Sequence, residues 1–211
     1  MVDRRLWERG AASLAELHPV LARCFQQHGA LTPKRSTKVA DRFESLASSI
    51  AYQQLTGRAA STIWARVVDA VPGPFTPSNV LATDPESLRR AGLSSAKTAS
   101  LIDLAASVDC RQLRLDRVGW MRDDEIVDHL TQVRGIGPWT AQMFLIFDLG
   151  RVDVWPIGDL GVRKGYSQLF GTESPPTAAE LDVLGTPFSP FRSVLAQWCW
   201  RAADGTDSEW L

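Results

Sequence analysis

The chain has 211 residues, a formal net charge of −1 and 45% hydrophobic residues. These values are typical of one folded domain, or of two small lobes that share a core, and they exclude a disordered chain. The near-zero charge points neither to nucleic acid nor to an anionic membrane as a partner. Three cysteines without CxxC spacing exclude a disulfide framework and a cysteine-rich zinc or iron–sulfur site.

Hydrophobic residues recur with helical spacing along nearly the whole chain. The predicted helices, in chain order, cover residues 41–55, 63–71, 85–92, 96–108, 123–133, 138–147, 178–184 and 191–203. Residues 77–84 are predicted to form a loop, and the proline-rich stretch 175–190 a connector to the last helix. Strand signals are weak, because the only candidate, residues 152–155, is short and isolated. We therefore predict an all-α fold.

The N-terminus lacks the apolar stretch of a signal peptide. No run of about 18 apolar residues predicts a membrane helix. We expect a cytoplasmic protein in a reducing compartment, with no membrane partner.

The segment 123–147 is the most informative part of the chain, because it predicts two helices joined by Gly135-Ile136-Gly137. Glycines allow backbone angles that other residues avoid, and they let another backbone approach closely. Pro138 fits the first position of the second helix, whose leading N–H groups point outward. A phosphate can bind such amides without any lysine. The alternative is a tight helix–helix corner that happens to contain two glycines.

Four motifs in this order resemble the helix-hairpin-helix (HhH-GPD) DNA glycosylases, in particular the 3-methyladenine type that acts on alkylated bases. They are Ile50–Leu55, Gly92–Lys97, the hairpin Leu130–Ala141 and the loop with an aspartate at 154–164. The resemblance implies a two-lobed helical fold with the active site in the cleft between the lobes. It also implies an N-terminal helical extension at 1–35, a glycosylase domain at 36–205 and a C-terminal tail at 206–211.

The resemblance implies a monofunctional DNA glycosylase that flips out alkylated purines, such as 3-methyladenine and 7-methylguanine. Such an enzyme hydrolyses the N-glycosidic bond in double-stranded DNA and thereby initiates base excision repair. Relatives that also cleave the backbone have a lysine where this chain has Trp139, and relatives with an iron–sulfur cluster have four cysteines where it has only Cys199. We therefore expect no lyase activity.

The expected partner is double-stranded DNA with alkylated bases, bound by a monomer that is associated with DNA in the cytoplasm. We expect no metal and no cofactor, although the hairpin carbonyls can hold a monovalent cation, as in relatives. Two alternatives stay open: the same fold acting on deaminated or oxidised bases, and a non-catalytic hairpin module that only binds DNA.

Asp159 is the catalytic candidate, because the catalytic aspartate of the family falls on this position. From position alone it is an N-cap of a helix that begins near residue 160, and the two roles are compatible. A carboxylate can stabilise an oxocarbenium-like sugar and orient the attacking water. Asp148 and Asp153 are the nearest rivals, and we expect both to be solvated. The three histidines are scattered, so no second acid is predicted.

A cationic base needs an electron-rich pocket, and the eight tryptophans can supply one. The pocket candidates are Tyr52, Trp139, Trp155 and Trp200. Core packing stays an equal alternative for the first three, whereas Trp64 and Trp198 are predicted to be core residues.

A wedge side chain must fill the gap left by a flipped base, and the resemblance places it at Gln54 or Leu55. The predicted DNA contacts are Gln53, Gln54, Leu55, Lys97, Arg134, Gly135, Ile136, Gly137 and Thr140. Further phosphate contacts can come from Lys34, Arg35, Lys38, Arg163 and Lys164, each of which is equally compatible with a solvated surface position.

Overall fold

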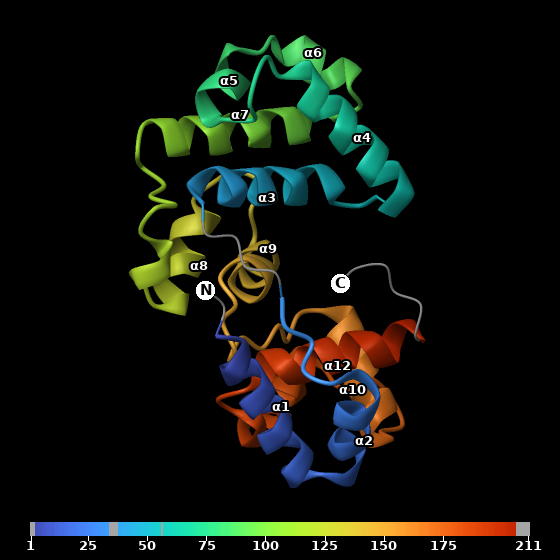
Figure 1. The fold of residues 1–211 in the computed structure, drawn as a ribbon. Coiled ribbons are helices and arrows are strands. Elements are labelled where there is room, and N and C mark those ends of the chain that lie inside the picture. Colours follow the sequence, from blue (N-terminus) through green and yellow to red (C-terminus); the bar gives the residue numbers. More distant parts are fainter. Residues whose placement is uncertain (1–2, 34–37, 56, 206–211) are drawn as a thin grey trace. The chain divides into compact units, whose positions relative to one another are not determined.

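The computed structural model describes residues 3–33, 38–55 and 57–205 (Figure 1). Within these ranges all regular structure is helical and no strand occurs, so the all-α prediction is confirmed. No helix of the described chain is both long enough and apolar enough to cross a membrane.

The chain divides into two compact units, which we describe separately. Unit 1 combines residues 1–35 with residues 145–211, and unit 2 comprises residues 36–144. The first 35 residues thus belong to the same unit as the C-terminal part of the chain. The predicted partition into 1–35, 36–205 and 206–211 follows the sequence alone and stays a prediction, and its last segment lies outside the described residues.

Unit 1 contains five α-helices among its described residues. They are α1 (Arg4–Leu17), α2 (Pro19–His28), α10 (Leu160–Phe170), α11 (Ala178–Gly185) and α12 (Arg192–Asp204). Two buried indoles connect the N-terminal and C-terminal segments of unit 1. Trp7 Nε1 donates to Gly150 O at 3.2 Å, and Trp198 Nε1 donates to Gly29 O at 3.1 Å. The prediction that Trp198 is a core residue is confirmed, since it is 1% exposed.

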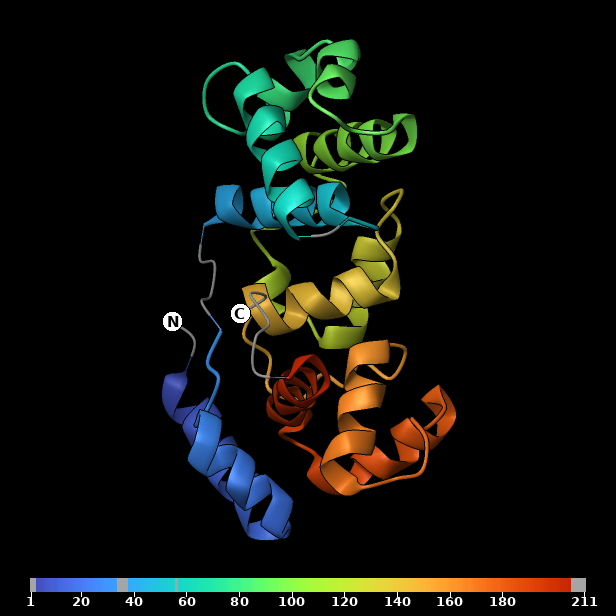
Figure 2. The ribbon, with the colours of Figure 1, turned by 90° about the vertical axis from the view of Figure 1, so that its right-hand side faces the viewer.

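Helices α10 and α12 lie side by side in unit 1 (Figure 2). Gly165 makes this possible, because a Cβ at this position would collide with the backbone carbonyl of Cys199. Because glycine has no side chain, the two helix backbones can come into direct contact here. The close packing fixes the start of α10 against the last turns of α12.

Unit 2 contains the remaining helices. They are α3 (Val39–Tyr52), α4 (Gly57–Ala70), α5 (Pro77–Ala82), α6 (Pro85–Arg90), α7 (Ser95–Asp109), α8 (Asp123–Thr131) and α9 (Pro138–Met143). Helices α3 and α7 pack along each other (Figure 1), with Phe43, Ile50 and Leu104 fully buried. Trp64 is only half-buried and packs edge-on against Phe75, so its predicted core role holds in part.

Four predicted segments differ from the structure. Residues 77–84 are not a loop, since Thr76 caps α5 by accepting from Asn79 N and Pro77 occupies its first position. The predicted helix 41–55 ends at Tyr52, and α9 passes at residues 144–148 into a π-helical turn. The predicted helix 63–71 begins earlier, at Gly57. Within the connector 175–190, α11 confirms the predicted helix 178–184, and a short 3-10 turn follows it.

Candidate active site and nucleic-acid interface

Asp159 begins α10, as its sequence position predicts. The Ile157 and Asp159 amides donate to the Trp155 and Pro156 carbonyls, at 2.9 Å each, and these bonds form a tight turn before the helix. Asp159 Oδ1 then accepts from Val162 N at 2.8 Å and satisfies one of the unpaired amides of the first turn. The carboxylate is half-buried and anchored to its own helix.

Trp200 holds the same carboxylate oxygen from α12. Its indole Nε1 donates to Asp159 Oδ1 at 2.9 Å. Gly161 makes room for the indole, since a Cβ there would lie 2.9 Å from Trp200 Cδ1. The aromatic ring of Phe147 lies 5.7 Å from that of Trp200, tilted by 31°. The structure therefore brings together the predicted catalytic residue and one predicted pocket aromatic.

Sequence reasoning missed two residues of this cluster. Phe147 falls at the end of the predicted helix 138–147, and it lies instead in the π-helical turn after α9. The only sequence signal for Gly161 is that it lies two residues after Asp159. The reason for a glycine here is visible only in the structure, where the Trp200 indole packs against it.

Cys199 precedes Trp200 and is fully buried. Burial raises the pKa of its thiol well above the usual value, and the nearby Cys24 and Asp159 raise it further. The thiol therefore stays protonated and adds no second negative charge near Asp159.

Of the two rivals of Asp159, Asp148 is buried, contrary to expectation, and Asp153 is partly exposed. Asp148 is 9% exposed. Asp153 accepts from Arg192 Nε at 2.7 Å and from Ser189 Oγ at 2.9 Å, which joins residues 152–155 to the start of α12. Burial alone would raise the pKa of Asp153, but the hydrogen bonds from Arg192 and Ser189 outweigh it and lower the pKa below its usual value.

The structure favours core packing over a base pocket for Trp155. This indole is 6% exposed, and its Nε1 donates to Leu181 O at 2.8 Å. Gly185 of α11 packs directly against the ring, so that a Cβ there would collide with Trp155 Nε1. With its one polar atom satisfied and its surface covered, Trp155 has no face left for a ligand. Its assignment to the pocket is corrected.

The hairpin, residues 134–137, and the turn after α3, residues 53–55, come together in unit 2. Gln53 Nε2 donates to Gly135 O at 2.8 Å. Gln54 follows with a φ of 58°, a conformation that a residue with a side chain rarely adopts, and its side chain is exposed. Leu55 is half-buried. The two predicted DNA-contact segments are therefore adjacent, and Gln54 is the more exposed wedge candidate.

The two hairpin glycines differ in whether the structure requires a residue without a side chain. Gly135 has a φ of 79°, and a Cβ on it would lie 2.9 Å from Ser100 Cβ. Gly137 is the N-cap of α9 with a φ of −96°, and a Cβ there would meet no atom within 4 Å. Gly135 therefore uses the unusual backbone angles that a glycine allows, and Gly137 does not. Nothing among the described residues requires its lack of a side chain.

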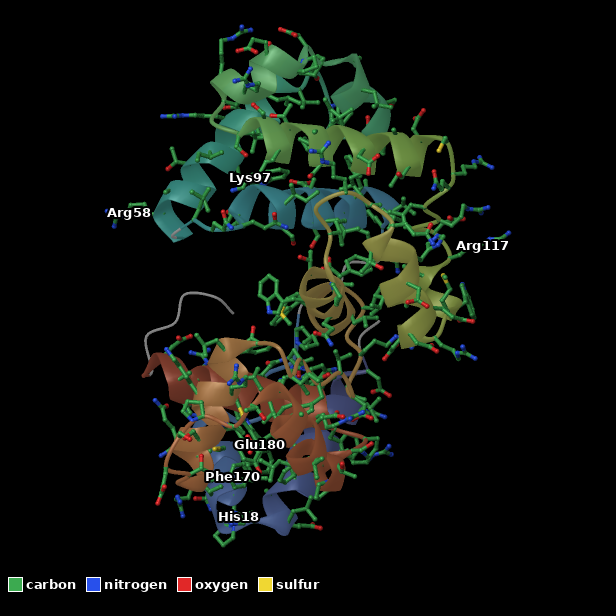
Figure 3. All side chains as sticks on the ribbon, turned by 180° about the vertical axis from the view of Figure 1, so that it is seen from behind. His18, Arg58, Lys97, Arg117, Phe170 and Glu180 are labelled. Atoms are coloured by element: carbon green, nitrogen blue, oxygen red, sulfur yellow. The ribbon has the colours of Figure 1, made fainter. Side chains whose placement is uncertain are left out.

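Lys97 has a structural role that the sequence did not predict. Its Nζ donates to Ala51 O at 2.8 Å and to Gln53 O at 2.5 Å, so it caps the C-terminal end of α3 (Figure 3). Partial burial lowers the pKa of this ammonium group. Two of its three donors are bound to backbone carbonyls, and its predicted phosphate contact stays a prediction.

The other predicted DNA contacts divide by exposure. Ile136 and Thr140 are each 4% exposed as whole residues, so neither side chain is open to a ligand. The Arg134 side chain is exposed, and its backbone N donates to Asp103 Oδ2 at 2.7 Å. Trp139 is 50% exposed.

Tyr52, the last residue of α3, is half-buried, and no contact of its ring decides between core and pocket. Of the basic residues, Lys34 and Arg35 lie outside the described ranges, and Lys38 and Lys164 are exposed. Arg163 Nε donates to Pro176 O at 2.6 Å, so this side chain holds the segment before α11.

Metal-binding side chains do not converge in the described ranges, where no three His, Cys, Asp or Glu residues lie close enough to hold an ion. The expectation that the protein uses no metal stays a prediction.

The family model and the relatives found by comparison with known proteins agree with one another. The family model of the HhH-GPD superfamily base excision DNA repair proteins matches residues 47–185. The chain is 33% identical over 182 residues to DNA-3-methyladenine glycosylase 1 of Schizosaccharomyces pombe, covering 85% of this chain and 80% of the relative. It is 32% identical to the DNA-3-methyladenine glycosylase of Saccharomyces cerevisiae, covering 80% and 69%.

A solved structure is similar over almost the whole length of both chains. It is the 3-methyladenine DNA glycosylase of Schizosaccharomyces pombe in complex with abasic DNA, with a TM-score of 0.82 and 29% sequence identity. The match covers 95% of this chain and 100% of that chain.

Proposed function

Because the chain belongs to the HhH-GPD superfamily of base excision DNA repair proteins, we propose that it is a DNA-3-methyladenine glycosylase. It removes alkylated purines from double-stranded DNA by hydrolysis and leaves an abasic site. The observation that carries the proposal is the carboxylate of Asp159, held on one oxygen by Val162 N–H and by Trp200 Nε1–H.

The hairpin supplies the DNA-binding part of the proposal. The open space beside Gly137 lets a phosphate approach the amides at the start of α9, where its charge is also favoured by the helix dipole. Arg134 adds an exposed positive charge beside the same turn. Such a site binds the phosphate backbone of the DNA, and this binding does not depend on the net charge of the protein. A net charge of −1 is therefore compatible with a DNA substrate.

The hairpin also contains candidate ligands for the monovalent cation that the resemblance implies. Val133 O accepts from Ile136 N, and Gly135 O accepts from Gln53 Nε2. Each carbonyl has a second lone pair, so the turn keeps oxygen ligands of the kind that such a cation prefers. We propose these hairpin carbonyls as its site and assign it no chemical step.

The chemistry needs one carboxylate and one water. A purine alkylated at N3 or N7 carries a formal positive charge, so it leaves as a neutral base with the electron pair of the N-glycosidic bond. Positive charge then develops on the deoxyribose, and the ionised Asp159 stabilises it. Water adds to the sugar carbon and gives up a proton, for which the same carboxylate is the acceptor.

Lyase chemistry by way of a Schiff base needs an amine at the position that Trp139 occupies, so the proposed enzyme is monofunctional. We also propose that the protein acts as a monomer. Gln54, exposed and held at a positive φ, is the proposed wedge.

The test is release of 3-methyladenine and 7-methylguanine from methylated duplex DNA by the wild type and by Asp159→Asn. An asparagine keeps the Oδ1 acceptor for Val162 and Trp200 and also caps helices well, so only the negative charge is lost. We expect base release to fall by about a thousandfold, with binding of abasic DNA retained.

The matched control is Asp84→Asn, which replaces the N-cap carboxylate of α6 in unit 2 and should leave base release unchanged. Full activity of Asp159→Asn would refute the role of Asp159. Release of hypoxanthine, uracil or 8-oxoguanine in place of methylated purines would refute the substrate class.

A further inference from the structure

One face of α7 contacts both predicted DNA-contact segments of unit 2. Lys97, Ser100 and Asp103 are spaced by three residues and therefore lie along one side of the helix. Lys97 holds the carbonyls of Ala51 and Gln53 at the end of α3. The side chains of Ser100 and Asp103 meet the hairpin, Ser100 beneath Gly135 and Asp103 at the amide of Arg134 (2.7 Å).

Gln53 joins the two segments directly. Its backbone carbonyl accepts from Lys97 Nζ at 2.5 Å, and its side-chain Nε2 donates to Gly135 O at 2.8 Å. The residue is thus fixed at both ends, by α7 on one side and by the hairpin 82 residues further along the chain on the other. Because Gln54 follows at once with a φ of 58°, the orientation of Gln53 determines where the exposed Gln54 side chain points.

We propose that Gln53 is a positioning residue that couples the hairpin to the wedge at Gln54. A phosphate bound at the hairpin and a side chain inserted into the base stack must keep a constant distance along the duplex, and the Gln53–Gly135 hydrogen bond maintains it. Without this bond the turn at residues 53–55 loses a fixed orientation, and the entropy of restoring it opposes insertion. The inference rests on the DNA-binding part of the proposed function and extends it to residues that need not touch the substrate.

The experiment compares binding of two duplexes, one intact and one with a tetrahydrofuran abasic analogue, by the wild type and by Gln53→Met. Methionine keeps the length of the side chain and removes both amide donors. We expect the preference for the abasic duplex to fall by about five- to tenfold, the effect of one hydrogen bond, because affinity for the abasic duplex falls by more than affinity for the intact duplex. A merely structural role would weaken binding of both duplexes together.

The matched control is Gln168→Met, which makes the same exchange at an exposed position of α10 in unit 1 and should leave the preference as in the wild type. An unchanged preference in Gln53→Met, an equal loss on both duplexes, or a wild type without preference for abasic DNA would each overturn the coupling. Base release by the wild type is measured in parallel. If it fails while the preference behaves as expected, the glycosylase assignment is wrong and the coupling stands.

Discussion

The two units hold their functional groups by different means. In unit 1 the carboxylate of Asp159 is bound by a side chain, Trp200, and by an amide of the helix that it caps. In unit 2 the hairpin and the turn after α3 are bound through their backbone, by Gln53, Lys97 and Asp103. A catalytic group needs its charge and direction fixed, whereas a phosphate-binding surface needs its amides and carbonyls fixed. Substitutions in unit 1 should therefore change the rate, and substitutions in unit 2 should change DNA affinity.

The largest effect that tests this contrast is expected for Trp200→Phe. Phenylalanine keeps an aromatic ring and removes the N–H that Asp159 Oδ1 accepts. A hydrogen bond to a charged group contributes about 1.5–3 kcal/mol, so kcat should fall by about ten- to a hundredfold in single-turnover base release. Affinity for abasic DNA should not change.

Trp198→Phe is the matched control on the same helix, since it also removes an indole donor, here to Gly29 O. It should lower Tm and leave kcat within about twofold of the wild type. If Trp200→Phe retained full kcat, Trp200 would act only by packing or stacking. This result would contradict the expectation that substitutions in unit 1 change the rate.

The next effect comes from a pair of alanine substitutions in the hairpin. Gly135→Ala puts a side chain on a φ of 79° and against Ser100, and should cost about 2 kcal/mol of folding free energy in urea unfolding. Gly137→Ala has an ordinary backbone and open space, so stability should change by less than about 0.5 kcal/mol. Its affinity for duplex DNA should fall by about tenfold, because the methyl group occupies the path of the phosphate.

Urea unfolding and duplex DNA affinity, measured on both variants, distinguish an effect on folding from an effect on DNA binding. A stable Gly137→Ala protein with wild-type DNA affinity would show that the hairpin is only a helix–helix corner, the alternative that the sequence left open.

The smallest effect concerns the pH dependence of unit 1 at Asp153. Although burial opposes it, the hydrogen bonds from Arg192 and Ser189 lower the pKa of Asp153 in the folded state. Its contribution to stability is therefore complete above the unfolded-state pKa of about 4 and is lost as the pH falls through the lower, folded-state value. Asp153→Asn should lower the free energy of unfolding by about 1–2 kcal/mol at neutral pH.

This difference from the wild type should shrink below about pH 4, as measured by urea unfolding over a pH series. Asp124→Asn is the control, since its ion pair with Arg122 is exposed and should contribute no measurable stability. A difference for Asp153→Asn that persists at low pH would show that the effect comes from packing and not from charge.

Local signals explain which parts of the molecule could be predicted. Asp159 as a helix N-cap and Pro138 at a helix start are properties of a few neighbouring residues, so the sequence contained them. The hydrophobic spacing of α7 and α12 predicted both helices to within a few residues. The four motifs also determined the family, because their order and spacing repeat a known pattern.

Long-range contacts decided the rest. The sequence could not show that Trp155 donates to Leu181 O and is covered by Gly185, or that Lys97 caps α3, because these partners are 26 and 46 residues away. The pairing of Trp200 with Asp159 and of Gln53 with Gly135 spans 41 and 82 residues. The sequence by itself determined which residue types are present and where helices begin, since both follow from local backbone chemistry. Only the tertiary structure decided which of those side chains are buried or hydrogen-bonded within the protein and which can bind a ligand. The reason is that burial and hydrogen-bond partners depend on packing between segments that are distant in the sequence.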